Sequence, residues 1–117
     1  MAKTGVELIA EERQRQIKKE GWSAEHDDEH INGEMAMAAA CYAAPQYLNR
    51  INDDGEIRDP WPWTELWDKR RCKDASVEIP NPETYSPEVR LDLLVKAGAL
   101  IAAEIDRLNR LKEKQKP

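Results

Sequence analysis

Acidic residues and histidines cluster between positions 25 and 34, in the sequence EHDDEHINGE. If this stretch forms one helix, Asp27, His30 and Glu34 fall within about 60° of one another around its axis. The same arc continues into apolar residues, so the three side chains would lie on the face that turns toward the core. Carboxylates on a buried face are costly unless they are paired or bind a metal. The cluster therefore predicts a metal site or a proton-transfer site.

The residue types in this cluster suit a divalent cation. Carboxylate oxygens spaced along a helix are ligands for Mg²⁺, and an imidazole among them also suits zinc, manganese or iron. We assign Asp27, His30 and Glu34 as candidate metal ligands, and Glu34 with His30 as the candidate catalytic pair. The alternative is that the acids stabilise a helix N-terminus through its dipole. That alternative explains Glu34 poorly, because Glu34 lies beyond the first turn.

A second pair of candidates is Asp92 with Lys96. At a spacing of four they can form a simple helical ion pair, which contributes a few tenths of a kcal/mol. The alternative makes Asp92 a further metal ligand and Lys96 a phosphate contact. On the first helix, Arg13 and its polar neighbours interrupt an apolar stripe, so Arg13 is a candidate for a polar cavity shared with the second helix.

A segment rich in tryptophan and basic residues runs from position 61 to 71, WPWTELWDKRR. Indole faces stack on bases or cations, and guanidinium groups bind phosphates through two parallel hydrogen bonds. Trp63, Trp67 and Arg70 are therefore candidate ligand-binding residues. The alternative is that the tryptophans fill the core of a small chain that contains no Phe.

Capping signals position these residues on three main helices. Thr4 and Glu7 form a capping box, Ser23 is a second N-cap, and Ser86 followed by Pro87 starts a third helix. The predicted fold is an all-α bundle with helices at 4–20, 23–44 and 87–111, an irregular Trp- and Pro-rich connection at 45–86 with a short helix near 64–71, and a frayed tail at 112–117.

The third helix carries an apolar seam at heptad-like spacing. The seam consists of Leu91, Leu94, Gly98, Ile101, Ile105 and Leu108. Gly98 would let a partner helix approach closely. A single domain of 117 residues buries a modest core, so we expect dimerisation or higher self-association to complete the bundle.

Composition limits the other functions. The net charge is −5, which argues against broad binding to nucleic acid through phosphates. No apolar run approaches the ~20 residues of a membrane span. The two cysteines, Cys41 and Cys72, are expected to be reduced thiols, and the chain to be cytoplasmic.

Longer motifs resemble those of a known group of proteins. The segments EERQRQ, EGW, EHDDEH, GEMAMAAACYA, WPW and DLLVKAGALIAAEIDRL resemble a group of small proteins carried by phages and prophages. That resemblance implies the cytoplasm of an infected or lysogenic bacterium. More loosely, the chain is similar to the MazG-like all-α nucleoside triphosphate pyrophosphohydrolases.

The looser resemblance implies an oligomeric helical bundle in which acids on two helices hold Mg²⁺ against a triphosphate. The matching positions are Asp27, His30 and Glu34 on one helix and Glu88 and Asp92 on another. It predicts a Mg²⁺-dependent protein that binds a nucleotide or other phosphorylated small molecule and hydrolyses a nucleoside triphosphate to monophosphate and pyrophosphate. Two alternatives remain. The first is a phage-encoded protein that acts against host defence without catalysis, either as a sponge for a nucleotide signal or as a module that binds a host protein. The second is a plain helical interaction protein.

Overall fold

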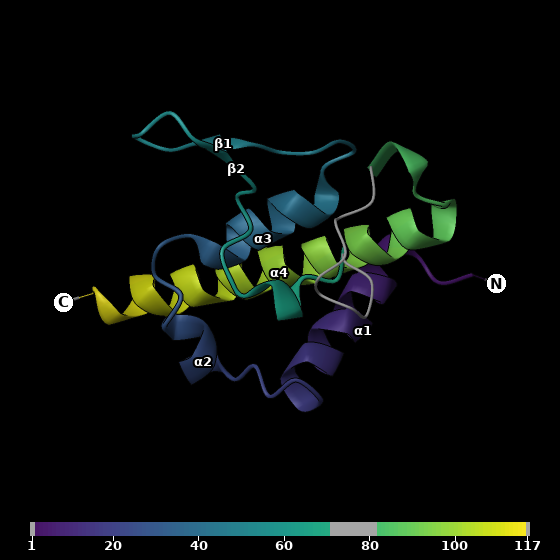
Figure 1. Cartoon of the computed structure of the whole chain (residues 1–117). Coiled ribbons are helices and arrows are strands. Elements are labelled where there is room, and N and C mark those ends of the chain that lie inside the picture. The colour runs from purple at the N-terminus through teal and green to yellow at the C-terminus, as the bar shows by residue number, and fades with distance from the viewer. Residues whose placement is uncertain (1, 71–81, 117) are drawn as a thin grey trace.

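One long helix organises the molecule. The structure is a computed structural model that describes residues 2–70 and 82–116. Helix α4 (Pro87–Lys114) runs through the middle, and α1 (Gly5–Lys18), α2 (Ala24–Asp28) and α3 (Glu34–Ala43) all pack against it (Figure 1). The predicted all-α fold class is confirmed. No helix in the described ranges is long and apolar enough to cross a bilayer.

Helix α1 begins where its capping signals predict. The Thr4 hydroxyl accepts a hydrogen bond from the backbone N–H of Glu7, and the Glu7 carboxylate accepts one from the backbone N–H of Thr4. The buried residues of α1 are nevertheless polar, namely Glu12 and Gln16. Val6 is 80% exposed. The face of α1 that meets the rest of the molecule is therefore mixed, with buried polar residues beside Ile9, which packs against Gly98 of α4.

The predicted continuous helix at 23–44 is wrong, because the chain breaks between α2 and α3. The Ser23 hydroxyl caps α2 by accepting from the backbone N–H of His26, at 3.2 Å. Helix α2 ends at Asp28, and Gly33 then adopts the left-handed conformation with φ 78° as the N-cap of α3. Only glycine takes this conformation at low cost, so Gly33 is a helix start and not a mid-helix residue.

The connection after α3 contains a short hairpin. Strands β1 (Arg50–Ile51) and β2 (Ile57–Arg58) pair antiparallel, with Ile51 opposite Ile57. The short helix predicted near 64–71 is a single 3₁₀ turn, η1 (Glu65–Trp67), and position 71 lies outside the described residues. A second 3₁₀ turn, η2 (Pro82–Thr84), precedes α4.

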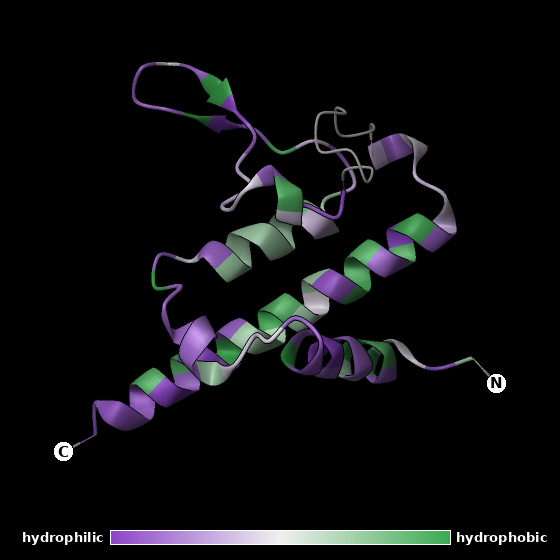
Figure 2. Cartoon of the chain, turned by 60° about the horizontal axis from the view of Figure 1, so that its bottom comes forward, coloured by the Kyte–Doolittle hydropathy of each residue, from purple (hydrophilic) through white to green (hydrophobic). Residues whose placement is uncertain are grey.

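The core lies between α3 and α4, whose apolar residues stand out in Figure 2. Its members are Met35, Ala38, Ala39 and Tyr42 from α3 and Leu93, Ala97, Leu100 and Ala103 from α4. The alanines allow the two helices to approach closely. Trp22, Trp61 and Trp63 pack around this core, so the core-filling alternative for the tryptophans is correct in part.

Helix α4 begins as predicted and ends later. The Ser86 hydroxyl accepts from the backbone N–H of Val89 at 3.2 Å, and Pro87 occupies the first turn. The helix continues to Lys114, so the predicted frayed tail is wrong for residues 112–114. Basic residues in the last turn, Lys112 and Lys114, suit the negative end of the helix dipole.

Candidate functional site

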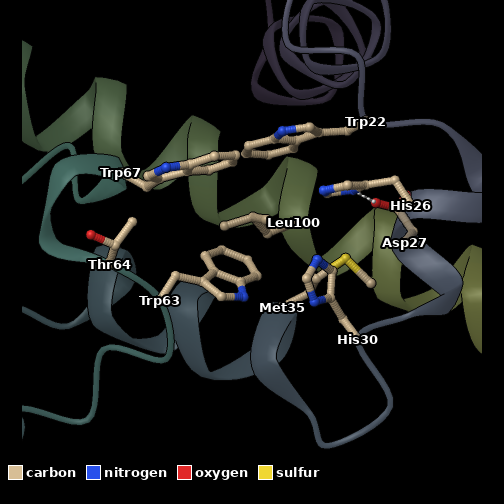
Figure 3. Close-up of a pocket in the computed structure, with 9 residues that line it drawn as sticks. All are labelled: Trp22, His26, Asp27, His30, Met35, Trp63, Thr64, Trp67 and Leu100. Carbon is tan, nitrogen blue, oxygen red and sulfur yellow. Dashed lines mark hydrogen bonds and ion pairs between the residues drawn. The ribbon is translucent and has the colours of Figure 1, made fainter.

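An aromatic cavity of about 260 Å³ opens between α2, α3, α4 and the segment around η1 (Figure 3). Residues that are far apart in the sequence contribute to it. Its lining is Trp22, His26, Asp27, His30, Met35, Trp63, Thr64, Trp67 and Leu100. Met35 and Leu100 belong to the core, so the cavity is backed by rigid, packed helices.

Two groups of rings form opposite sides of the cavity. The rings of Trp22 and Trp67 are nearly parallel, with centroids 6.1 Å apart and planes inclined by 6°. His26 extends this wall, parallel to Trp22 within 8°. Trp63 and His30 lie across from it, with centroids 5.2 Å apart (Figure 3). The two imidazoles approach edge to face, with centroids 5.0 Å apart.

Asp27 lines the cavity and forms a buried ion pair with Arg13. Its carboxylate is 1% exposed and accepts a hydrogen bond from Nη2 of Arg13 at 3.2 Å. The other carboxylate oxygen lies 3.4 Å from Nδ1 of His26. A buried carboxylate requires such partners. Arg13 therefore links α1 to α2, and Asp27 orients the His26 ring.

His30 has a carboxylate partner of its own. Its Nδ1 lies 3.5 Å from Oε2 of Glu34, and the other Glu34 oxygen accepts from the backbone N–H of Asn32 at 2.6 Å. Partial burial raises the pKa of Glu34. This effect is outweighed by hydrogen bonds from the backbone N–H groups of Glu34 and Asn32 and by the side chain of His30, so the pKa of Glu34 lies below its ordinary value. Glu34 is therefore ionised at neutral pH and fixes the orientation of His30.

Two indole nitrogens at this site have no hydrogen-bond partner among the described residues. They are Nε1 of Trp22 and Nε1 of Trp63, and both are buried. The Trp63 nitrogen faces the side of the cavity where His30 lies (Figure 3). A buried donor without a partner costs free energy, so Trp63 offers a hydrogen bond to a ligand with an acceptor atom.

The structure brings only part of the predicted metal set together. His30 and Glu34 are paired and Asp27 lines the same cavity, whereas the Asp92 side chain is 62% exposed and pairs with Lys96 at 3.4 Å. Within residues 2–70 and 82–116, no group of three or more His, Cys, Asp or Glu residues is placed to hold a metal ion. The donor set therefore does not fit the Mg²⁺ site that the resemblance implies.

The predicted phosphate contacts already have carboxylate partners. Arg70 is bound by Asp59 at 3.0 Å and by Asp68 at 2.9 Å, and its side chain is 4% exposed. These two carboxylates raise the pKa of the Arg70 guanidinium more than its burial lowers it. Lys96 lies 3.9 Å from Glu12 in addition to its pair with Asp92. Arg70 thus stabilises its own loop, and it is not free to bind a phosphate.

Trp63 and Trp67, predicted from the sequence to bind a ligand, line the cavity, and so do Trp22 and His26, which were not among the predicted site residues. His26 belongs to the stretch of acids and histidines at 25–34 but is not among its candidate ligands, and Trp22 precedes that stretch. Both are spaced by four from the next aromatic ring, in the series Trp22, His26 and His30. The spacing of four between Trp22 and His26 was the signal that could have identified the wall, since these two rings stack, whereas His30 follows the end of α2 and lies across the cavity.

The chain matches no model of a known protein family, no curated protein and no solved structure. The chemistry of this cavity is therefore the basis for proposing a function.

Proposed function

We propose that the chain binds a nucleotide or nucleoside through its base, without a metal. The observation that carries the proposal is a cavity lined by three indoles and two carboxylate-paired imidazoles. Aromatic rings stack on every base, because every base has a π face. This corresponds to the non-catalytic nucleotide-binding alternative drawn from the sequence.

The geometry supports stacking against one wall. A ring inserted between two others requires about 7 Å between them, since carbon atoms in contact lie about 3.5 Å apart. Trp22 and Trp63 have centroids 6.4 Å apart and are inclined by 54°, so the gap is too narrow for insertion. A base would therefore stack on the parallel rings of Trp22 and Trp67, toward the open side of the cavity.

Polar atoms around the cavity suit the edge of a base. The Trp63 N–H can donate to a ring nitrogen or carbonyl oxygen. The Nδ1 atoms of His26 and His30 are engaged by carboxylates, which leaves their Nε2 atoms for the ligand. The cavity of about 260 Å³ is slightly below the usual ~300–1,000 Å³ of ligand pockets. It therefore suits a base, with the phosphates directed toward solvent.

Calorimetric titration of the chain with nucleosides, nucleoside monophosphates and triphosphates tests this proposal. The variant Trp67→Ala removes one stacking ring, and we expect affinity to fall roughly 5- to 150-fold, from about 1–3 kcal/mol per stacked base. The matched control is Leu66→Ala, because Leu66 is the neighbouring residue of η1 and is 76% exposed. The control should bind with unchanged affinity.

Two further results would distinguish this proposal from its alternatives. A nucleoside should bind about as tightly as its triphosphate, and EDTA should not change the affinity, since neither phosphates nor a metal contribute to the proposed contacts. Absence of binding by every member of the panel would overturn the proposal and favour the host-protein module. Binding that disappears with EDTA would show that a metal is needed.

The His30–Glu34 pair favours a second candidate function, hydrolysis of a nucleoside triphosphate to monophosphate and pyrophosphate. A carboxylate that orients an imidazole is a common arrangement for a general base. Incubation with each triphosphate and Mg²⁺, followed by chromatography of the products, tests this candidate. Turnover that is lost in His30→Gln would support it, and intact triphosphates throughout the panel would exclude it.

A further inference from the structure

The parallel rings of Trp22 and Trp67 also border a second cavity, and we call these two rings the indole wall. The second cavity has a volume of about 220 Å³ and is lined by Glu20, Trp22, Leu66, Trp67 and Lys69. Of these residues, only the two tryptophans also line the aromatic cavity of the proposed site. The indole wall therefore borders two spaces.

The two cavities meet the indole wall beside different neighbours. Trp63 and Met35 line the first cavity and lie on one side of the two rings (Figure 3). Leu66 and Lys69 line the second cavity and not the first. An indole ring has two faces, and either face can stack on a base. The wall thus has a stacking surface for a second base, which the proposed site does not use.

The second cavity contains an available cation. The backbone N–H of Lys69 donates to the Tyr42 hydroxyl at 3.1 Å, but its exposed ammonium has no hydrogen bond or ion pair within residues 2–70 and 82–116. Glu20 carries the opposite charge, and Arg15 binds its carboxylate at 2.9 Å. A lysine ammonium is a common contact for phosphate. A base in this cavity would therefore lie next to a group that suits its phosphate.

Neither cavity alone has the volume of an ordinary ligand site. Volumes of about 260 Å³ and about 220 Å³ both fall below the usual ~300–1,000 Å³, whereas the two together fall within that range. A ligand that fills both spaces needs two flat groups, because each space is bordered by the indole wall, and a linker that passes around the rings. Two bases joined through a phosphate meet these requirements.

We infer that the ligand is a dinucleotide, with one base on each side of the indole wall and the linking phosphate beside Lys69. This inference rests on the proposed function, because the first base occupies the proposed site. The second base holds the phosphate near Lys69, whereas the phosphate of a mononucleotide stays directed toward solvent. The net charge of −5 disfavours a long strand, so two bases and their linkage are the extent of the ligand.

Tyr42 holds this segment in position before a ligand binds. Its hydroxyl donates to the backbone carbonyl of Trp67 at 3.3 Å and accepts from the backbone N–H of Lys69 at 3.1 Å. Tyr42 is 4% exposed and belongs to the core between α3 and α4. The stacking ring and the cation are therefore attached to the same rigid residue, which lowers the cost of ordering them on binding.

Calorimetric titration with linear and cyclic dinucleotides, each compared with the mononucleotide of the same base, tests this inference. We expect one dinucleotide per chain, with an affinity roughly 5- to 150-fold above that of the mononucleotide, the range for one additional stacked base. Mononucleotide binding without such a gain would overturn the inference and leave the proposed function intact, whereas absence of binding by every ligand would overturn both. A single strand of about eight nucleotides that binds far more tightly than the dinucleotide would identify a strand as the ligand and refute the inference.

The variant Lys69→Gln tests the second side of the indole wall. Lys69 is exposed, so the substitution preserves the fold. We expect dinucleotide affinity to fall about 2- to 5-fold, as for an exposed charge pair, and mononucleotide affinity to stay unchanged. Leu66→Ala should likewise weaken only the dinucleotide. The matched control Lys112→Gln changes an exposed lysine in the last turn of α4 and should affect neither ligand. Equal losses for both ligands in Lys69→Gln, or no loss for either, would contradict the inferred arrangement.

Discussion

The substitution Arg13→Met tests the buried ion pair that fixes one side of the cavity. Methionine keeps a long apolar side chain, so the main change is loss of the guanidinium that donates to Asp27 at 3.2 Å. Removing one partner of a buried pair costs about 3–5 kcal/mol, because the other charge stays buried without compensation. Asp27 is 1% exposed, which places it within that case.

One feature of the wild-type pair reduces this cost. Nε and Nη1 of Arg13 are buried and have no hydrogen-bond partner among the described residues, and each such atom costs about 1 kcal/mol or more. Arg13→Met removes both. We therefore expect a net loss of about 1–3 kcal/mol in the free energy of unfolding, a substantial part of the ~5–15 kcal/mol typical of a domain.

Urea unfolding, followed by both circular dichroism and tryptophan fluorescence, measures this loss. The variants are Arg13→Met, Asp27→Asn and their combination, with Arg58→Met as a matched control. Arg58 forms an ion pair with Glu56 on the surface, so its loss should cost less than about 1 kcal/mol. The double variant should be more stable than the sum of the single effects predicts. If Arg13→Met costs no more than the control, or if the two effects add independently, the ion pair does not stabilise the fold as argued.

Three further predictions concern other parts of the molecule. In Gly98→Ala the new Cβ would clash with Ile9, so we expect urea unfolding to show a loss of about 1–2 kcal/mol in the free energy of unfolding, despite the better helix propensity of alanine. Ile9→Ala removes the clashing atoms, so it should largely cancel the cost of Gly98→Ala. Burial raises the pKa of the Cys41 thiol to about 11, so in a Cys72→Ser variant its reaction with a disulfide reagent at about pH 8 should be far slower than that of a free thiol, and unfolding should abolish the difference. Hydrogen bonds from Arg110 lower the pKa of Asp28 in the folded chain. The pair therefore contributes stability above about pH 4, and this stability is lost as the pH falls through the lowered pKa of the folded state. The difference in unfolding free energy between wild type and Arg110→Ala should disappear in acid, and a difference that persists there would contradict this account.

Helix starts could be predicted from the sequence because their determinants are local. The Thr4–Glu7 capping box and the Ser86 cap each involve residues three apart, and the structure forms both as predicted. The break before Gly33 could not be predicted in the same way. A glycine inside a helix costs only about 1 kcal/mol, so the choice between a continuous helix and two helices depends on tertiary contacts.

The partners of charged residues were the least predictable feature of the candidate site. Arg70 was predicted to bind phosphate, but it lies against Asp59, eleven positions earlier, and Asp68. No helical or strand spacing relates Arg70 to Asp59, since the contact depends on how an irregular segment folds back. The tryptophans were easier to predict, because an indole in a small chain without Phe is either part of the core or exposed for binding. Trp63 occupies both kinds of position, since it packs on the core and lines the cavity.

The break between α2 and α3 also explains how the cavity is built. Helix α2 is attached to its surroundings by two ion pairs, Arg13 with Asp27 and Arg110 with Asp28 at 2.8 Å, whereas α3 is held by apolar packing on α4. The ring of His26 belongs to α2, and Met35 on the opposite side belongs to α3. A continuous helix would carry both residues on one rigid rod and could not place them across a cavity. Two acids of the charged cluster, Asp27 and Asp28, therefore attach the short helix that carries His26.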